Sequence, residues 1–137
     1  MSRKPRQYAA LPYREAKKGR IEVLLITSRG AGRWLIPKGW PMKGRKPHET
    51  AAREAYEEAG AVGRPDRRPV GVYAGRKRMN GSRIRCHIEV YPLPVSRLKA
   101  NWPESAERVR KWFDVKKAAA LVDEPGLESL ILAISGR

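Results

Sequence analysis

The chain has 137 residues and a formal net charge of +16, from 30 Lys and Arg against 14 Asp and Glu. This length fits one domain over residues 1–137 with one proper hydrophobic core. The charge favours anionic partners but carries no information about the fold. The only cysteine is Cys86, which excludes an intramolecular disulfide and favours a reducing compartment. No apolar run approaches a membrane span and no signal peptide is recognisable, so we expect a cytoplasmic protein without a membrane partner.

The first elements are read from short patterns. Met1–Gln7 is short and basic, and we expect a mobile tail there. Ile21–Thr27 is a nearly continuous apolar run with β-branched residues, which predicts a central strand. Arg29–Arg33 contains two glycines and predicts a turn, and Trp34–Ile36 predicts a short strand that leads into a glycine-containing loop.

After residue 61 the patterns favour further strands. Val62–Arg68 is polar and predicts a connection, and Pro69–Gly75 predicts a strand. Residues 83–91 alternate between apolar and polar side chains, which predicts a strand with one buried face. The segment between these strands, Gly75–Ser82, predicts a hairpin tip in which Asn80-Gly81 supplies the turn.

The C-terminal part predicts one more strand and two helices. Val109–Phe113 is the strand, and Asp114 is placed to cap a helix over Val115–Leu121. Glu124–Ser135 predicts a last helix. Its expected inner face consists of Leu127, Leu130, Ile131 and Ile134. Together the patterns predict a mixed sheet flanked by helices.

The most informative segment is Gly39–Ala61, in which Glu54, Glu57 and Glu58 stand at positions i, i+3 and i+4 of an expected helix. At about 100° per residue these three side chains fall in one narrow arc. The neighbouring arc holds small or apolar residues, namely Ala51, Ala52, Ala55, Tyr56 and Ala59. Unneutralised like charges at such spacings destabilise a helix. Their convergence therefore indicates a hard divalent cation such as Mg²⁺ bound over them.

This segment resembles the Nudix box, G-x5-E-x7-R-E-U-x-E-E-x-G-U, where U is a bulky apolar residue. Six positions match in register: Gly39, Arg53, Glu54, Glu57, Glu58 and Gly60. Arg45 stands where the pattern has its first Glu, and Ala55 and Ala61 are smaller than usual. An ordinary surface helix with i,i+4 ion pairs is the alternative interpretation, but the glycine-containing loop in the family register favours the Nudix box.

The resemblance implies an α/β/α sandwich with a mixed sheet and a metal-dependent pyrophosphohydrolase. It makes Glu54 and Glu58 the best metal ligands, with Glu57 as a third. Lys38, through its backbone carbonyl, and Gly39 would complete the metal site. Mg²⁺ is the expected ion and Mn²⁺ the alternative. Arg53 would position the box by pairing with a carboxylate rather than by acting on the substrate.

The catalytic base is expected outside the box, because Arg45 replaces the first Glu of the pattern. Glu104 and Glu107, before Trp112, are the candidates, and both have the alternative interpretation of solvated loop carboxylates. Substrate phosphates would contact basic residues of the loop and of the hairpin tip, whose alternative role is a solvated charged surface. These residues are Lys38, Lys43, Arg45, Arg76 and Arg78.

The segment Trp34–Gly39 and the acidic residues before Trp112-Phe113 resemble the branch that includes diphosphoinositol-polyphosphate and diadenosine-polyphosphate hydrolases. The expected substrate is accordingly an inositol pyrophosphate or a dinucleoside polyphosphate. An RNA 5′-end or nucleotide-pool pyrophosphohydrolase is the alternative. A non-catalytic polyanion-binding module is least favoured, because such a protein has no use for clustered glutamates. Nucleic acid stays open as a partner without being favoured, and both a monomer and a homodimer stay open.

Overall fold

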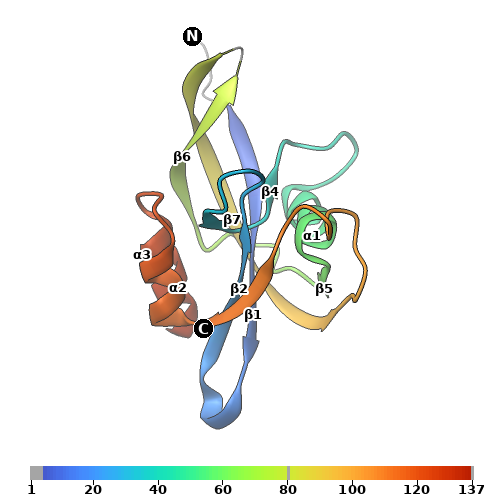
Figure 1. Cartoon of the computed structure of the whole chain (residues 1–137), viewed down its shortest axis with the longest axis vertical. Helices are drawn as coiled ribbons and strands as arrows, with labels where there is room; N and C mark the ends of the chain where they lie inside the picture. The colour runs from blue at the N-terminus through green and yellow to red at the C-terminus, as the bar shows by residue number, and fades with distance from the viewer. Residues whose placement is uncertain (1–4, 80, 137) are drawn as a thin grey trace.

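The computed structural model describes residues 5–79 and 81–136, with the backbone alone over 76–79. A mixed sheet lies between one helix on one face and two helices on the other (Figure 1). The strands are β1 Arg6–Glu15, β2 Ile21–Thr27, β3 Trp34–Leu35, β4 Lys38–Gly39, β5 Ala61–Gly63, β6 Gly71–Met79, β7 Ser82–Leu98 and β8 Arg110–Asp114. The helices are α1 Pro47–Ala59, α2 Val115–Leu121 and α3 Leu127–Ala133, with 3-10 turns at Lys17–Gly19 and Ile134–Gly136. The expected α/β/α sandwich is confirmed.

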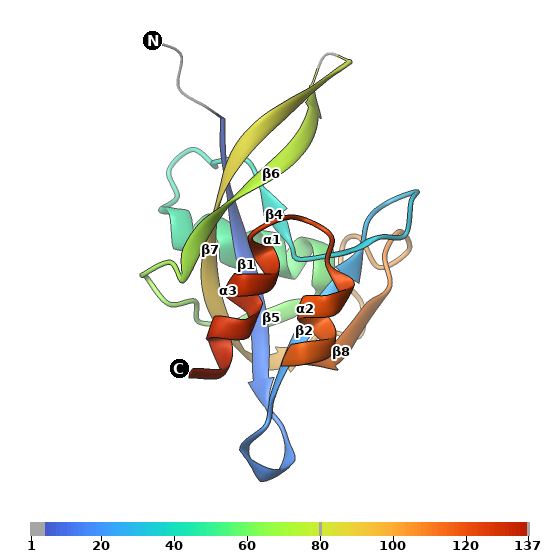
Figure 2. The same cartoon turned by 90° about the vertical axis from the view of Figure 1, so that its left-hand side faces the viewer.

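The strand order is β3-β2-β1-β7-β5, with β4 paired to β1, β6 to β7 and β8 to β2. β1 and β7 run parallel over eight residue pairs, and the other strand pairs are antiparallel. Helix α1 covers one face of this sheet, whereas α2 and α3 lie beside each other over the opposite face (Figure 2). Among the described residues, no helix is long and apolar enough to cross a membrane.

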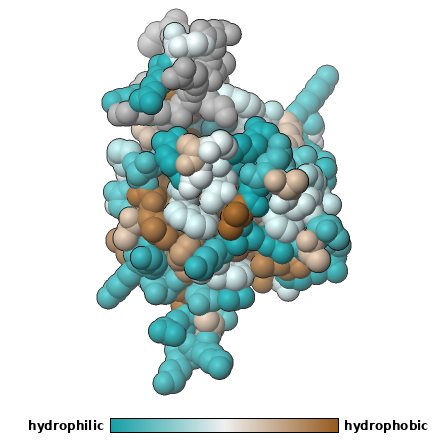
Figure 3. All heavy atoms as spheres, viewed as in Figure 1, coloured by the Kyte–Doolittle hydropathy of each residue, from teal (hydrophilic) through white to brown (hydrophobic). Residues whose placement is uncertain are grey.

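The core lies on both faces of the sheet, and this explains why the sequence of β2 is continuously apolar. Val23 and Leu25 pack in the cluster that includes α2 and α3 residues, whereas Leu24 and Ile26 pack in the cluster with α1. Strands buried on both faces lack the alternation of a half-exposed strand. The surface is different in character: hydrophilic side chains cover most of the face seen in Figure 3, and apolar side chains form only small areas.

Two segments that were predicted to be irregular are shorter than expected, because strands occupy part of them. The expected tail over Met1–Gln7 is too long, because Arg6 and Gln7 belong to β1 and Gln7 is buried; residues 1–4 lie outside the described part. No strand was expected over Arg6–Glu15, although β1 is central in the sheet. The connection expected over Val62–Arg68 is also too long, because β5 occupies its beginning.

The hairpin of β6 and β7 is longer than predicted. Met79 pairs with Ser82, so the strands continue through most of the expected tip and only two residues connect them. Asn80 lies outside the described residues, and Gly81 has φ 79°, the left-handed conformation that a glycine adopts without steric cost. At its other end β7 extends to Leu98, which carries the chain toward the site described below.

The first of the two C-terminal helices, α2, has the predicted bounds, and the second begins later than predicted. Lys117 N donates to Asp114 Oδ1 at 2.9 Å, which is the expected cap of α2. Helix α3 begins at Leu127 rather than Glu124, because Gly126 has φ 91° and is not helical. Of the expected inner face, Leu127, Ile131 and Ile134 are buried, and Leu130 is partly buried against the same core cluster.

Candidate active site

Helix α1 carries the acidic residues, and its first turn is fixed by local contacts. Pro47 occupies the first turn, where a missing N–H costs nothing, and Lys46 N donates to Glu49 Oε1 at 2.7 Å. At the other end Gly60 has φ 66°, the left-handed conformation expected of a glycine that ends a helix. A Cβ at Gly60 would also clash with Trp102 and Arg110.

The last turn of α1 is held by side chains from distant segments. Trp102 Nε1 donates to the carbonyl of Glu58 at 3.0 Å, and Arg110 Nη1 donates to the carbonyl of Ala59 at 2.9 Å. The Arg110 guanidinium lies 3.8 Å from the centroid of the Trp102 ring. Carbonyl groups at a helix C-terminus have no partner within the helix. These two donors satisfy them and fix the orientation of Glu57 and Glu58.

The three glutamates of α1 differ in burial although they share one arc of the helix. Glu58 is 7% exposed, whereas Glu54 and Glu57 are half-buried. A Cβ added to Gly39 would overlap the carboxylate of Glu54, so a glycine is needed for the loop to pass so close. Strand β4 and the acidic arc of α1 are therefore in direct contact.

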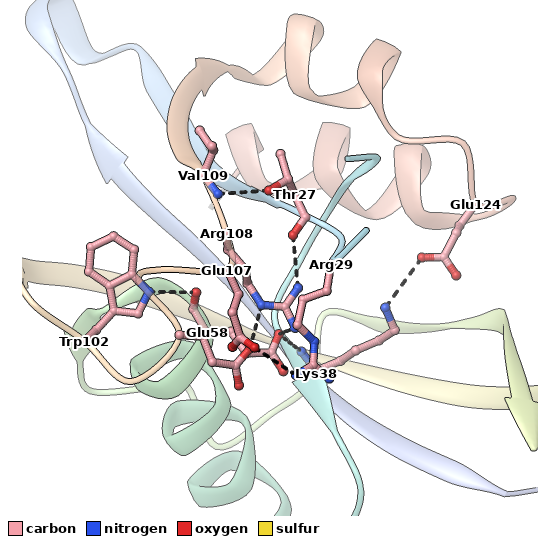
Figure 4. Close-up of polar contacts among 10 residues, drawn as sticks. Thr27, Arg29, Lys38, Glu58, Trp102, Glu107, Arg108, Val109 and Glu124 are labelled. Carbon is pink, nitrogen blue, oxygen red and sulfur yellow. Dashed lines mark hydrogen bonds and ion pairs between the residues drawn. The ribbon is translucent and has the colours of Figure 1, made fainter. Parts of the chain in front are cut away.

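Arg108 is the main counter-ion of this cluster. Its side chain is 9% exposed; Nε lies 2.7 Å from Glu104 Oε1, and Nη2 lies 3.8 Å from Glu58 Oε1. Its Nη1 donates to the carbonyl of Thr27 at 3.0 Å, at the end of β2 (Figure 4). A buried guanidinium with two carboxylates and a carbonyl around it holds a fixed position.

Glu104 and Glu107 occupy different surroundings. The backbone N–H of Glu104 donates to the carbonyl of Glu57 at 3.0 Å, and its carboxylate pairs with Arg108. Glu107 has a half-exposed side chain that lies 3.8 Å from Arg29 Nη1. The structure therefore brings Glu104 to the last turn of α1, whereas Glu107 lies on a more exposed part of the same loop.

Burial and mutual repulsion change the acidity of these groups. Burial raises the pKa of Glu58 to about 8, against the lowering effect of Arg108 and with a further raising effect from Glu54. Burial also raises the pKa of Glu54, and repulsion from Glu57 adds to this shift. A cluster of this kind releases protons readily when a cation binds, because the cation removes the cost of the negative charges.

Lys38 lies between the acidic cluster and the α3 side of the molecule. Its backbone N–H donates to Glu58 Oε1 at 3.4 Å, and its ammonium lies 3.9 Å from Glu124 Oε1 (Figure 4). Tyr73, which is buried, donates its hydroxyl to the same Glu124 oxygen at 3.4 Å. The backbone of Lys38 thus contacts Glu58, whereas its ammonium lies beside Glu124 on a side chain that is 15% exposed.

The donor set suits a hard divalent cation by its chemistry. Glu54, Glu57 and Glu58 offer carboxylate oxygens, the ligands that Mg²⁺ prefers. Within residues 5–79 and 81–136, however, no three acidic, His or Cys side chains already surround a common point. Arg108 lies between Glu58 and Glu104 in this arrangement.

Other predicted site residues lie elsewhere or lack contacts with the cluster. Arg53 Nε lies 3.5 Å from Glu57 Oε2, the pairing expected of it. Lys43 is exposed and makes no hydrogen bond or ion pair with any described residue. Arg45 lines a pocket on another side of α1, described below. The side chains of Arg76 and Arg78 lie outside the described part, so their expected role is untested.

Sequence reasoning missed four residues of this region: Arg108, Trp102, Arg110 and Glu124. Arg108 had a weak signal, because it follows Glu104 at the i,i+4 spacing typical of an ion pair. Trp102 and Arg110 reach the site only because β8 lies against β2 and the loop before β8 folds over the end of α1, whereas Glu124 reaches Lys38 from the segment between α2 and α3. A local pattern does not reveal such contacts.

Comparison with known proteins identifies the family. The NUDIX domain matches residues 4–133, nearly the whole chain, so the protein belongs to the NUDIX domain family. The resemblance of Gly39–Ala61 to the Nudix box is thereby confirmed.

Particular relatives refine this placement. The chain is 33% identical to "Nudix hydrolase 21, chloroplastic" of Arabidopsis thaliana over 130 residues, which is 93% of this chain and 64% of the relative. It is 37% identical over 100 residues to human "Diphosphoinositol polyphosphate phosphohydrolase 3-beta", covering 71% of this chain and 57% of the relative. The chain thus spans roughly three fifths of each. The crystal structure of C. elegans Ap4A hydrolase matches with a TM-score of 0.64 at 20% identity, covering 98% of both chains, and shows the common fold.

Proposed function

We propose that the protein is a divalent-metal-dependent pyrophosphohydrolase that cleaves a diphosphate linkage in a polyphosphorylated substrate. One observation carries the proposal: a buried Glu58 beside Glu54 and Glu57 on one arc of α1, with Glu104 and Arg108 across from it. A protein that only binds polyanions has no use for carboxylates there, because they repel phosphate. Membership of the NUDIX domain family supports the same class of reaction.

In this proposal Glu54 and Glu58 hold Mg²⁺, with Glu57 as a further ligand. When bound, such an ion neutralises phosphate charge and lowers the pKa of a water molecule. The chain's own residues position the reactants. The Lys38 ammonium binds phosphate oxygens, and Trp102 and Arg110 keep the last turn of α1 in place. Arg53 pairs with Glu57 and so limits the rotation of that side chain.

We further propose Glu104, rather than Glu107, as the general base. The backbone N–H of Glu104 donates to the carbonyl of Glu57, and its carboxylate lies beside Arg108, which also pairs with Glu58. Glu107 instead pairs with the exposed Arg29. Water attacks one phosphorus and its proton passes to a Glu104 oxygen. The P–O–P bond breaks, and the bridging oxygen leaves on the other phosphate. Arg108, at 2.7 Å, holds the Glu104 carboxylate in position for this transfer.

For the substrate we propose an inositol pyrophosphate or a dinucleoside polyphosphate. The support is the formal charge of +16 and the 37% identity to a diphosphoinositol polyphosphate phosphohydrolase. Each added phosphate should gain from nearby cations, and salt should weaken that gain because exposed charges are screened beyond about 8 Å at physiological ionic strength. Mg²⁺ rather than Mn²⁺ as the natural ion, a cytoplasmic location, and a single domain over residues 1–137 belong to the same proposal.

A substrate panel with Mg²⁺ tests this function. It contains an inositol pyrophosphate, diadenosine tetraphosphate, ADP-ribose and a 5′-triphosphorylated RNA, with products separated by chromatography at low and high salt. We expect the first two to be cleaved most efficiently, with a preference over ADP-ribose that shrinks as salt rises. A preference for ADP-ribose that does not respond to salt would contradict the substrate class, and no cleavage of any compound would contradict the enzyme.

A further inference from the structure

A second concave surface lies on α1, away from the glutamates. It has a volume of about 900 Å³ and is formed by α1 together with the loop that follows β5. We call it the outer pocket and define it by Arg45, Arg53, Tyr56, Arg64, Arg67 and Arg68. Two of its helical members lie opposite the acidic arc: at about 100° per residue, Ala52 and Tyr56 fall about 160–200° around the helix from Glu54. Arg53 lies between Tyr56 and Glu57 and pairs with Glu57, so it borders both surfaces, whereas the other arginines of the outer pocket lie away from the acidic arc.

The charge of the outer pocket is strongly positive. Five arginines line it against two acidic residues, Glu49 and Asp66, so its formal charge is five minus two, or +3, with His48 neutral. Glu49 accepts the N–H of Lys46, and Asp66 accepts the N–H of Arg68. Of the five arginines, Arg53 pairs with Glu57, with 3.5 Å between Arg53 Nε and Glu57 Oε2.

The loop that carries three of these arginines is anchored at both ends. Asp66 N donates to the carbonyl of Pro92 at 2.9 Å, and Val70 N donates to the carbonyl of Val90 at 2.7 Å. The arginines are thus presented by a backbone that is tied to β7 rather than by a loose segment. Ala52, Tyr56 and Pro65 supply apolar surface between them, with the Arg53 guanidinium 5.3 Å from the Tyr56 ring centroid.

We propose that the outer pocket binds a small anion that carries several phosphate groups, at a site distinct from the hydrolytic centre. Guanidinium groups bind phosphate through paired N–H donors, which makes arginine the preferred residue for such ligands. Neighbouring arginines repel one another, and a polyphosphate removes this repulsion. The volume lies within the range of small-molecule sites and the apolar floor accommodates an organic part of the ligand.

Calorimetric titration of the full chain with inorganic tripolyphosphate, in EDTA, tests this proposal without the metal-dependent centre. The variant Arg64→Gln/Arg67→Gln/Arg68→Gln should lose about tenfold or more in affinity, which is about 1.4 kcal/mol, because it removes three guanidinium groups that bind phosphate. The matched control Lys17→Gln/Lys18→Gln/Arg20→Gln removes the same charge at the far hairpin of β1 and β2 and should change affinity less than threefold.

Equal losses in both variants would show that only net charge matters, and this result would overturn the proposal. So would unchanged affinity in the pocket variant. Turnover separates the two sites: the pocket variant should hydrolyse substrate at the parent rate in Mg²⁺, because none of its three residues contacts Glu54, Glu58 or Glu104 in the described structure. Loss of turnover with a fold unchanged by circular dichroism would mean that the outer pocket is part of the substrate site.

Discussion

The two solvent-facing sides of α1 carry opposite charges in different environments. On one side Glu58 is 7% exposed and its pKa is raised to about 8, mainly by burial. On the other side an open pocket is lined by the exposed Arg53 of α1 and by the exposed Arg45 of the loop before the helix. Burial makes a charged group costly and therefore responsive to a cation or a proton, whereas exposed groups are screened by water and salt. The acidic side is suited to chemistry and the basic side to binding.

The largest effect should come from the buried carboxylate. Glu58→Gln keeps the size of the side chain and removes its charge, so turnover should fall by about 10²–10³, the usual cost of losing one preorganised electrostatic group. Steady-state kinetics at saturating Mg²⁺ measure the change. Glu15→Gln, an exposed position at the end of β1, is the matched control and should retain parent turnover. Undiminished turnover in Glu58→Gln would remove Glu58 from the active site.

The next effect separates the two candidate bases. Glu104→Gln should slow turnover by about 10², with little change in Mg²⁺ affinity, because a base acts on water rather than on the ion. Glu107→Gln should change turnover less than about threefold, since its partner Arg29 is exposed and such pairs contribute little. The reverse order would make Glu107 the base, and two fully active variants would place the base within the box or in metal-bound solvent.

The stability of the metal-free protein should depend on pH through Glu58. Its folded pKa is raised from 4.5 to about 8, so the folded state holds an extra proton between these values. Stability should therefore fall as pH rises through this window and level off above it, by up to about 1.4 kcal/mol per pH unit. Thermal melts in EDTA from pH 5 to 9 measure the slope. Glu58→Gln should flatten it, and an unchanged slope in that variant would assign the pH dependence to other groups.

The smallest effect concerns the clamp at the end of α1. Trp102→Phe replaces the indole with a smaller aromatic ring and removes the Nε1 donor to the carbonyl of Glu58, which should lower the free energy of unfolding by about 1–2 kcal/mol. Denaturant unfolding gives this value. Turnover should fall several-fold as the last turn loosens, with Mg²⁺ dependence shifted to higher concentration. A stability loss without any change in metal dependence would show that Trp102 supports the fold alone.

Local sequence patterns predicted the helices and strands that can be recognised from their own residues, without knowledge of their neighbours in the fold. The run Ile21–Thr27 and the capped helix over Val115–Leu121 have the predicted bounds, and Gly60 ends α1 as expected. β1 was missed because it is buried on both faces, so it does not alternate, and Pro12 interrupts it. Its strand character comes from pairing with β7, about eighty residues away in the chain, which no local window contains.

The candidate active site likewise contains residues that the sequence pattern predicted and residues that only strand pairing brings there. Glu54, Glu57 and Glu58 share one helix, so their spacing alone places them together. Arg108 and Trp102 reach them only because β8 pairs with β2 and carries the preceding loop to the end of α1. Arg45 was expected near the phosphates by its position in the box, yet it lines the outer pocket. Sequence spacing predicts neighbours within an element and says little about contacts between elements.

Direct measurement of divalent-cation binding tests most sharply whether the acidic arc of α1 is the metal site. Mn²⁺ is titrated into the metal-free chain and free ion is followed by electron paramagnetic resonance, with Mg²⁺ as competitor. The parent and Glu15→Gln should bind Mn²⁺ with the same affinity, and Glu54→Gln/Glu58→Gln should bind it at least about tenfold more weakly, because two charged oxygen ligands are lost. Parent-like Mn²⁺ binding by the double variant, displaced by Mg²⁺ as in the parent, would place the metal elsewhere.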